Sequence, residues 1–409
     1  MRSTNHPLGG PPPNKPGQQK PSKDTGAYRF LRRTAFANMC SGAPEGPSLA
    51  LRSNPQFRAT YLHSEKTLSR CASTTFPHGG LAVKQIVLLE PGVWGERDAP
   101  HPPLGLDEAL VRIHRVGVCG SDLNAFKGEH PAYSFPRVLG HELGVEVVET
   151  GQNDSGIQPG ARCAVESFYS CGRCRACAAG LTNCCEQLKY LGIHIDGGMQ
   201  PLLNVPVSKL FKSERLSFDE LALIEPLAVG AHAVGRSRLQ RGEDVVVIGC
   251  GVIGLAVVQF AKAHGGRVRV VEKNPWRREF AKALGVETTE AANDEQYPVV
   301  IDATGNTASM EASFESVAPG GHLVFVGLVS GPISFPDWLF HRREMTVLAS
   351  RGSLNLFPQV IKMLEDGEIN VSSWVTHRMA LRDVPQQFAE LRSHADLVKA
   401  MVHVEEPGL

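Results

Sequence analysis

Residues 245–254 read Val-Val-Val-Ile-Gly-Cys-Gly-Val-Ile-Gly, an apolar run that passes directly into a glycine-rich turn. Four apolar residues in succession are typical of a strand buried in a parallel sheet, and residues 252–264 continue with a helix-like pattern. In this Gly-x-Gly-x-x-Gly motif, Gly249 permits a tight turn, Gly251 lets the backbone approach a pyrophosphate, and Gly254 allows close packing of the helix on the strand. The stretch therefore predicts a strand–turn–helix unit that binds a dinucleotide.

A second predicted strand, residues 268–271, is followed by Glu272, which lies 18 residues beyond Gly254. A carboxylate at this place accepts hydrogen bonds from ribose hydroxyls and repels a 2′-phosphate, so we expect NAD rather than NADP. Arg277 and Arg278 follow closely and weaken that preference. A glycine turn without a ligand is the alternative, and the strand–turn–helix context disfavours it.

The pattern changes on either side of this unit. Short apolar runs at 299–301, 323–326 and 346–348 alternate with helical segments, which is the rhythm of a doubly wound parallel sheet. Upstream, residues 83 to about 210 are rich in glycine, proline and short β-branched runs, and this texture predicts a compact, mostly β unit. Its first strands are expected at 83–89 and 109–114, and helices at 357–364 and 384–392 are expected to return to it. The predicted fold class is α/β.

The charge distribution excludes some classes of protein. The 409 residues include 42 Lys and Arg and 42 Asp and Glu, but residues 1–80 hold 11 of the basic and only 3 of the acidic ones. The rest of the chain is therefore acidic, which argues against a nucleic-acid-binding protein. No apolar run approaches the roughly 18 residues of a membrane span, so we expect no membrane partner.

The first eighty residues are rich in Pro, Gly, Ser and Arg and show no sustained apolar period. Such a composition buries too little apolar surface to offset the entropy of ordering, so we expect a disordered extension. An organellar transit peptide, a dispensable tail and a gene start near Val83 are the alternatives for this segment.

Four cysteines follow one another closely at Cys171, Cys174, Cys177 and Cys185. Four thiolates at this spacing can close around one tetrahedral zinc, and the site is structural because no position remains for substrate. Disulfides are improbable at this spacing in a cofactor-binding protein. The adjacent Cys184 could replace Cys185, but Cys185 is preferred. The remaining thiols look unpaired, which predicts a reducing, cytoplasmic location.

A second set of metal-ligating residues is spread along the chain. Cys119 follows the strand that begins near Val111, His141 and Glu142 stand together some twenty residues later, and Glu225 lies at the start of the nucleotide-binding region. One thiolate, one imidazole and one or two carboxylates make a mixed zinc site that can keep a position open for substrate. Singly, Cys119 could be a buried apolar residue and His141 a core histidine.

These motifs together resemble the zinc-dependent medium-chain dehydrogenases of the alcohol, sorbitol and threonine dehydrogenase superfamily, from about residue 83 to the C-terminus. The resemblance implies a GroES-like β-barrel catalytic domain, residues 81–224 with 355–409 returning to it, and a Rossmann domain, residues 225–354. It also implies one catalytic and one structural zinc per chain, a small-molecule substrate, and a homodimer or homotetramer.

By matching motif, Cys119 and His141 become catalytic zinc ligands, and Glu142 and Glu225 complete the shell directly or through water. Ser121 matches the hydroxyl residue that hands the substrate proton toward solvent. The residues expected to bind the cofactor are Gly249, Gly251, Val252, Ile253, Gly254, Glu272, Asp302 and Gly327.

One position departs from the family pattern. Asp122 matches a carboxylate behind the zinc ligands, but Asn124 stands where many relatives have a histidine, and an amide cannot relay a proton by titrating. The outer end of the proton relay therefore stays unassigned, with water, a ribose hydroxyl or another side chain as alternatives.

Local strings at 133–142, 300–306 and 349–351 resemble the sugar-acid branch of this superfamily, typified by L-galactonate and L-gulonate 5-dehydrogenases. The expected reaction is hydride transfer from a secondary alcohol of such a substrate to NAD, with the guanidinium of Arg351 binding the carboxylate. Arg351 could instead contact the cofactor or a neighbouring subunit. Polyol or L-threonine oxidation, and an inactive zinc-binding scaffold, are the alternative functions. Both metal sets disfavour a zinc-free quinone reductase, and the acidic body disfavours a zinc ribbon that binds nucleic acid.

Overall fold

The computed structural model describes residues 82–404, apart from residues 101 and 152. The predicted disorder of residues 1–80 lies outside the described residues. Within them, none of the helices is both long and apolar enough to cross a bilayer.

The glycine-rich stretch lies at the centre of a six-stranded sheet in which all neighbouring strands are parallel. The order β12-β11-β10-β13-β14-β15 is that of a dinucleotide-binding fold, with the first strand in the middle. The predicted strands are confirmed, and β12 is an addition. The bounds are β10 (Asp244–Ile248), β11 (Arg267–Val271), β12 (Glu287–Thr289), β13 (Tyr297–Asp302), β14 (Val317–Phe325) and β15 (Thr346–Ala349).

The apolar run in β10 is buried on both faces of this sheet. Val245 and Val247 belong to one hydrophobic cluster, which includes side chains of α3 (Phe218–Ser237) and α4 (Val252–His264). Val246 and Ile248 belong to another cluster, on the side of α7 (Asp337–Arg342). Because successive side chains of a strand point to opposite faces, a continuous apolar run is needed when helices cover both.

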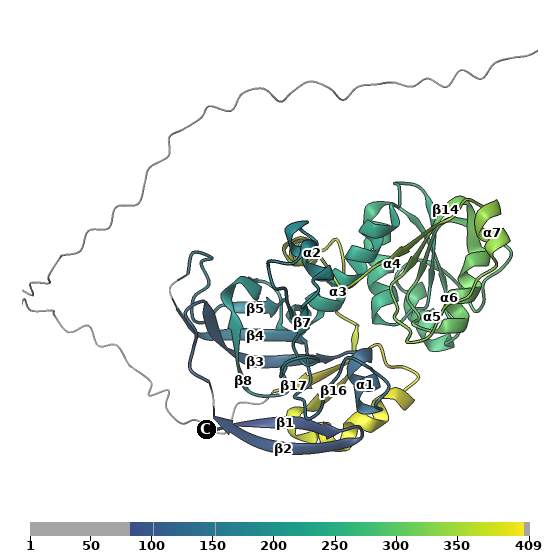
Figure 1. The fold of residues 1–409 in the computed structure, drawn as a ribbon. Coiled ribbons are helices and arrows are strands. Elements are labelled where there is room, and N and C mark those ends of the chain that lie inside the picture. Colours follow the sequence, from purple (N-terminus) through teal and green to yellow (C-terminus); the bar gives the residue numbers. More distant parts are fainter. Residues whose placement is uncertain (1–81, 101, 152, 405–409) are drawn as a thin grey trace, which may run out of the picture. The chain divides into compact units, whose positions relative to one another are not determined.

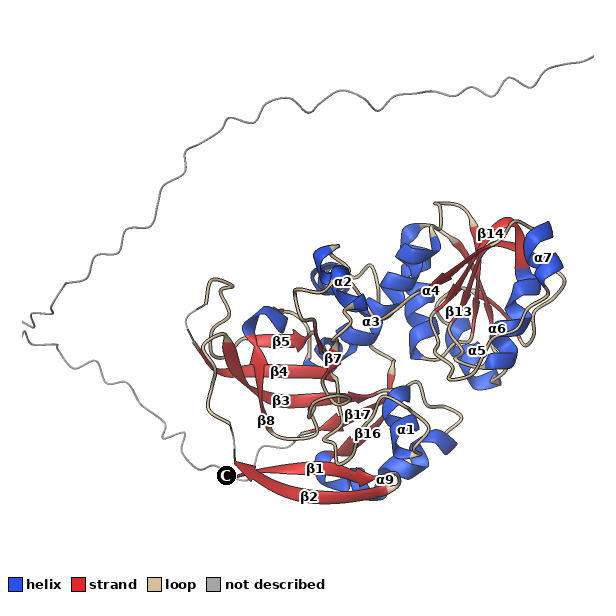
Figure 2. Cartoon of the chain, viewed as in Figure 1, coloured by secondary structure: helices blue, strands red, loops and turns tan. Residues whose placement is uncertain are grey.

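The other main sheet has seven strands, in the order β16-β17-β3-β4-β5-β9 with β8 beside β3 (Figure 1). Its last strand in the chain, β17, pairs antiparallel with β3, so the C-terminal segment completes the unit that the N-terminal strands begin. A mostly β unit is confirmed, and strands predominate there in Figure 2. The bounds are β3 (Glu108–Val118), β4 (Glu142–Thr150), β5 (Arg162–Val165), β8 (Leu202–Pro206), β9 (Leu210–Lys212), β16 (Val375–Ala380) and β17 (Lys399–His403).

Short elements complete the described chain. The strands are β1 (Ala82–Glu90), β2 (Val93–Pro100), β6 (Phe168–Tyr169) and β7 (Lys189–Tyr190). The α-helices are α1 (Gly120–Phe126), α2 (Arg175–Ala178), α5 (Pro275–Lys282), α6 (Thr307–Ala312), α8 (Phe357–Glu365) and α9 (Val384–Gln387). The 3₁₀ turns are Thr182–Cys184, Val207–Lys209, Ser313–Ser316, Leu381–Asp383 and Phe388–Ser393.

Helix α3 connects the two sheets along the chain, and the predicted domain boundary at residue 225 falls inside it. The helix starts with a capping box, in which the hydroxyl of Ser217 accepts the N–H of Glu220 and the Glu220 carboxylate accepts the N–H of Ser217. In its first turn, Asp219 accepts hydrogen bonds from Arg115 on β3, at 2.9 Å, and from Arg378 on β16, at 2.6 Å. These charged contacts join α3 to the seven-stranded sheet.

Candidate active site

The first element of the site is the junction between β3 and α1. Cys119 is the residue before α1, and its backbone N–H donates to the Asp122 carboxylate at 3.0 Å. That bond satisfies an N–H at the helix start and orients the Cys119 backbone. The cysteine is thereby held where the strand ends.

The second element is the start of β4. His141 and Glu142 are buried, and Glu142 pairs in register with Gly117 on β3. A Cβ at residue 117 would lie 2.0 Å from Oε2 of Glu142, so the glycine provides the space for this carboxylate. The ligand atoms of Cys119, His141 and Glu142 all lie within 4.8 Å of one another. A thiolate, an imidazole and a carboxylate so placed fit a zinc ion that keeps a position open.

A buried carboxylate, that of Asp122, lies behind the imidazole of His141. Nδ1 of His141 lies 3.6 Å from Oδ1 of Asp122, and the Tyr133 hydroxyl donates to the same oxygen at 3.2 Å. Burial raises the pKa of Asp122, although His141 and the Cys119 N–H oppose the shift. Burial also disfavours the charged form of His141, but Asp122 and Cys119 raise its pKa well above the usual value. At 3.6 Å the two atoms are not hydrogen-bonded, so Asp122 acts on the imidazole through its charge.

Lys399 is a site residue that the sequence reasoning missed. Its ammonium is buried and donates to both oxygens of Glu142, at 2.7 and 2.6 Å, and to the carbonyl of Val118 at 3.0 Å. All three donors of the ammonium are therefore satisfied. The signal was present, since a lysine in an apolar strand is rarely buried without a partner.

Glu225, on α3, does not belong to the close group of ligand atoms among the described residues. It lies near enough to act on the same charges, because its carboxylate contributes to the raised pKa of His141. Burial raises the pKa of Glu225 itself to about 7, with His141 opposing and Glu142 adding to the shift. The structure thus places Glu225 outside the inner group but within its electrostatic reach.

The structure brings two hydroxyls together at the expected start of the proton relay. The Tyr133 hydroxyl lies 3.4 Å from Oγ of Ser121. Asn124, at the position that departs from the family pattern, accepts a hydrogen bond from the guanidinium of Arg392 at 3.1 Å. The amide thus has a structural partner. Tyr133 is a second residue that the sequence reasoning left without a role.

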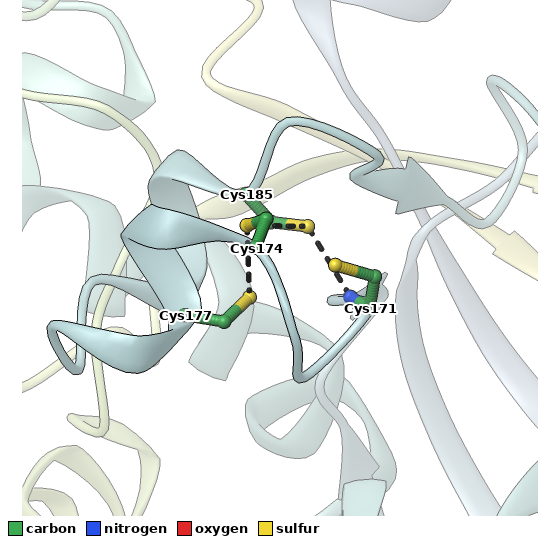
Figure 3. A group of neighbouring side chains, drawn as sticks. All are labelled: Cys171, Cys174, Cys177 and Cys185. Atoms are coloured by element: carbon green, nitrogen blue, oxygen red, sulfur yellow. Dashed lines mark hydrogen bonds between the residues drawn. The ribbon is translucent and has the colours of Figure 1, made fainter.

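Figure 3 shows four cysteines turned toward one another, in the loop that is called the cysteine lobe below (residues 171–185). The ligand atoms of Cys171, Cys174, Cys177 and Cys185 all lie within 4.8 Å of one another, whereas Cys184 is exposed and outside the group. The sulfurs of Cys174 and Cys177 are 3.5 Å apart, and those of Cys174 and Cys185 are 3.9 Å apart. Zinc–sulfur bonds of about 2.3 Å in a tetrahedron place the sulfurs roughly 3.8 Å apart, so the cluster fits zinc.

Backbone groups in the lobe stabilise thiolates. The N–H groups of Cys171 and Gln187 donate to the sulfur of Cys185, at 3.2 and 3.3 Å. Backbone donors at Cys177 and Glu186 lower the pKa of Cys174 to about 6. The loop backbone therefore favours the deprotonated form of Cys174, whereas burial and the neighbouring thiols raise the pKa of Cys177 to about 11.

The glycine turn lines a pocket of about 560 Å³ together with Glu272, Lys273 and Arg277. Gly249 adopts φ +87°, and a Cβ at Gly254 would lie 1.9 Å from the Gly249 carbonyl, so both need glycine. The Glu272 carboxylate accepts the N–H of Cys250 at 2.7 Å. It is thus held at the edge of the turn.

The remaining cofactor candidates lie around the same end of the sheet. Val252 and Ile253 form the first turn of α4, whose N-cap is Gly251. Asp302, at the end of β13, is buried and accepts hydrogen bonds from Thr304 and Ser309. A Cβ at Gly327 would lie 2.2 Å from the N of Gly305, so this close approach requires glycine.

Arg351 contacts the cysteine lobe. Its Nε donates to the carbonyl of Asn183 at 3.0 Å, and the Asn183 side chain donates back to the Arg351 carbonyl at 2.8 Å. Burial raises the pKa of Tyr190, the charge of Glu225 adds to the shift and that of Arg351 opposes it. Burial lowers the pKa of His194, and the charge of Arg351 lowers it further. A Cβ at Gly352, the next residue, would lie 3.0 Å from the Tyr190 hydroxyl oxygen, so this segment lies beside Tyr190.

Comparison with known families gives two matches. Residues 105–215 match the alcohol dehydrogenase GroES-like domain, and residues 252–366 match the zinc-binding dehydrogenase family. The chain is 36% identical over 325 residues to the L-galactonate-5-dehydrogenase of Escherichia coli K12, covering 76% of this chain and 95% of the relative. It is 32% identical to the sorbitol dehydrogenase of Bacillus subtilis 168, covering 74% and 92%. The chain belongs to the zinc-binding medium-chain alcohol dehydrogenase family.

Solved structures of such dehydrogenases superpose on this one. A zinc-binding dehydrogenase of Sinorhizobium meliloti 1021 bound to NADP gives a TM-score of 0.73 at 29% identity, covering 79% of this chain and 99% of the other. The RspB alcohol dehydrogenase of E. coli CFT073, complexed with NADH, gives 0.75 at 26% identity, covering 79% and 100%. The expected GroES-like and Rossmann domains are confirmed. The protein is a zinc-type alcohol dehydrogenase, an oxidoreductase that acts on CH–OH donors.

Proposed function

We propose that this alcohol dehydrogenase oxidises a secondary alcohol of a sugar acid, such as L-galactonate or L-gulonate, with NAD as the hydride acceptor. The observation that carries the proposal is the Cys119–His141–Glu142 group, in which His141 and Glu142 are buried and Cys119 is partly exposed, with the Ser121 hydroxyl on the helix that follows Cys119. The L-galactonate-5-dehydrogenase of E. coli supports the sugar-acid class. The sorbitol dehydrogenase of B. subtilis favours an uncharged polyol as the second candidate.

Each residue of the site is proposed to have a separate role in the reaction. Cys119, His141 and Glu142 would hold the zinc ion, which would supply Lewis-acid chemistry to the substrate hydroxyl. Ser121 accepts the hydrogen bond of that hydroxyl and passes its proton outward, with the Tyr133 hydroxyl 3.4 Å away as its next neighbour. NAD would supply the hydride acceptor, and the residues around the glycine turn would hold it. Glu225 is proposed to complete the shell of the metal, directly or through water.

Arg351 is the residue proposed to bind the substrate carboxylate. Its side chain is exposed, and its Nε–H bond to Asn183 anchors one edge of the guanidinium. A guanidinium anchored in this way is preorganised for a carboxylate. We expect Arg351→Ala to raise the KM for L-galactonate or L-gulonate at least tenfold, with Arg351→Lys intermediate, because a carboxylate loses a charge-assisted partner.

The test is steady-state kinetics on L-galactonate, L-gulonate, sorbitol and L-threonine with NAD. The expected order of kcat/KM places the two sugar acids first. Sorbitol as the best substrate, with an Arg351→Ala enzyme that handles it normally, would overturn the sugar-acid assignment and leave polyol oxidation. Turnover of none of the four would favour an inactive scaffold.

The preference for NAD is proposed from Glu272, which lies in the pocket beside the glycine turn. Its carboxylate repels a 2′-phosphate, while Lys273 and Arg277 in the same pocket limit the discrimination. Glu272→Ser is expected to raise kcat/KM with NADP relative to NAD by about tenfold. An unchanged ratio would remove Glu272 from the specificity argument.

One catalytic and one structural zinc per chain are proposed from the two donor groups. Elemental analysis of the purified protein is expected to return two zinc atoms per chain. A single atom that survives in Cys119→Ser and disappears in Cys174→Ser would mean that only the lobe holds metal.

A homodimer or homotetramer is proposed from the edge of the parallel sheet. Strand β15 lies at the end of the strand order and exposes Val347, and the large apolar side chains of Leu328, Phe335 and Trp338 are exposed in the preceding segment. Light scattering after gel filtration tests this, and a shift toward the monomer is expected for Trp338→Glu.

A cytoplasmic location is proposed because none of the eight cysteines of the described residues forms a disulfide bond.

A further inference from the structure

A third group of potential metal ligands lies away from both sets described above. His377 is on β16, and His394 and Asp396 lie in the segment between the turn Phe388–Ser393 and β17. Their ligand atoms all lie within 4.8 Å of one another. Nε2 of His377 is 3.8 Å from Oδ1 of Asp396, and Nδ1 of His394 is 3.9 Å from the same oxygen.

The distances are close to those of a coordination shell. Zinc–ligand bonds of about 2.0–2.2 Å in a tetrahedron separate the ligand atoms by roughly 3.4 Å. Each imidazole nitrogen therefore needs to approach Oδ1 of Asp396 by about half an ångström. The side chains of His394 and Asp396 are 43% and 54% exposed, so both can rotate to do so.

The ring of His377 is held in the orientation that a metal needs. Oγ1 of Thr376 lies 2.9 Å from Nδ1 of His377 and accepts the N–H of Val398 at 3.1 Å. The hydroxyl oxygen can also accept a hydrogen bond from Nδ1–H. That tautomer leaves the lone pair of Nε2 directed toward Asp396.

We propose that His377, His394 and Asp396 form a third metal site, for a divalent transition ion such as Zn²⁺, Ni²⁺ or Cu²⁺. Two imidazoles and one carboxylate select these ions over Ca²⁺ and Mg²⁺, which prefer shells of oxygen. Water fills the remaining position because the site is open to solvent.

A bound ion would restrain a segment that also accepts hydrogen bonds from α5 and its N-cap residue. The Asn274 side chain donates to the carbonyl of Ala395 at 2.7 Å, and Arg277 donates to the carbonyl of Leu397 at 3.1 Å. Arg277 lines the pocket beside the glycine turn. A bound ion would therefore restrain residues 394–397, on which this cofactor-side arginine rests.

The test is calorimetric titration of the full-length, zinc-loaded protein with ZnCl₂ after weakly held metal has been removed. One additional ion per chain is expected to bind, and His394→Ala and Asp396→Asn are each expected to weaken that binding at least tenfold. The matched control is His341→Ala. Its Nε2 lies 3.5 Å from Asp337 on the exposed face of α7, a histidine–carboxylate pair outside the three ligand groups of the described residues.

Three results would overturn the proposal: no additional ion in the wild-type protein, unchanged binding in His394→Ala, or an equal loss in His341→Ala. If a variant fails to fold, paramagnetic resonance of Cu²⁺ added to the zinc-loaded wild-type protein decides the matter. Coupling to two imidazole nitrogens supports the site, and a signal without nitrogen coupling overturns it.

Discussion

The cysteine lobe and the Cys119–His141–Glu142 group are both suited to zinc, but the chain builds them differently. The lobe collects its four cysteines within residues 171–185, and backbone N–H groups of the same loop donate to the sulfur of Cys185. The active group combines a strand end with the start of the next strand and depends on Lys399, which is 257 residues from Glu142. A metal site made by one loop is a local property, whereas the catalytic group needs the whole sheet.

The largest effect is expected where the active group itself is broken. Cys119→Ser removes a thiolate from the catalytic set, so we expect kcat/KM to fall at least 10³-fold, about 4 kcal/mol of transition-state stabilisation. Steady-state kinetics measure this, and zinc content should fall by one atom per chain while cofactor binding persists. Near-normal turnover in Cys119→Ser would contradict the assignment of the catalytic metal.

The second prediction tests the long-range partner of the active group. Lys399→Met leaves the buried Glu142 carboxylate without its ammonium, and breaking a buried ion pair on one side costs about 3–5 kcal/mol of unfolding free energy. Urea unfolding measures the loss. The control is Lys362→Met, which removes an ammonium that pairs with Asp366 on the surface and should cost far less, because solvent screens an exposed pair. Equal losses in the two variants would mean that the buried pair of Lys399 and Glu142 stabilises the protein no more than a surface pair does.

The third prediction concerns the lobe. Cys174→Ser removes a thiol whose pKa is lowered to about 6, so we expect loss of one zinc per chain and a lower unfolding free energy. At low temperature, turnover should fall far less than in Cys119→Ser, because the lobe holds no substrate position. The neighbouring Cys184→Ser should change neither zinc content nor stability. A lobe variant as inactive as Cys119→Ser would erase the distinction between the two metal groups.

The smallest effect is expected at the contact that joins α3 to the seven-stranded sheet. Burial alone would raise the pKa of Asp219, but the hydrogen bond from Arg378 and the charge of Arg115 lower it below its usual value. A lowered pKa means that the ionised form is stabilised by folding. The contribution is therefore present above the unfolded pKa of about 4 and is lost as the pH falls through the lower folded value.

Asp219→Asn should thus destabilise the protein by about 1 kcal/mol at pH 7, and by less as the pH falls below about 4. Denaturant unfolding at several pH values measures the difference. Glu96→Gln, which removes an exposed pair with Lys84, is the control and should show almost no loss at any pH. A loss for Asp219→Asn that grows as the pH falls would contradict the sign of the pKa shift.

Much of the fold follows from local pattern, and its limits follow from the same fact. The helix predicted at 252–264 is α4, and the apolar run at 245–248 lies within β10. The run expected at 323–326 overlaps the end of a longer strand, β14, which ends at Phe325. The start of β14 was missed because its residues there include two glycines and a proline, which hide the pattern. Strand β12 has only three residues, Glu287–Thr289, and is too short and polar to show an apolar run.

The candidate site shows the same division. Cys119, His141, Glu142 and the four lobe cysteines were visible because each stands in a motif of a few residues. Lys399 and Tyr133 were not, because what defines them is a partner far along the chain. The exchange of hydrogen bonds between Arg351 and Asn183 is of this second kind, since the two residues are 168 positions apart.

By itself, the amino-acid sequence determined the glycine turn, the strand that precedes it, and the set of thiolates that one loop can bring around an ion. These depend on backbone freedom, side-chain alternation and short spacings, which neighbouring residues impose on one another. Only the tertiary structure decided that β17 lies beside β3, which delivers the ammonium of Lys399 to Glu142. It also brought the ligand atoms of His377, His394 and Asp396 close together. Such pairings depend on which distant segments become neighbours, and no local pattern encodes that choice.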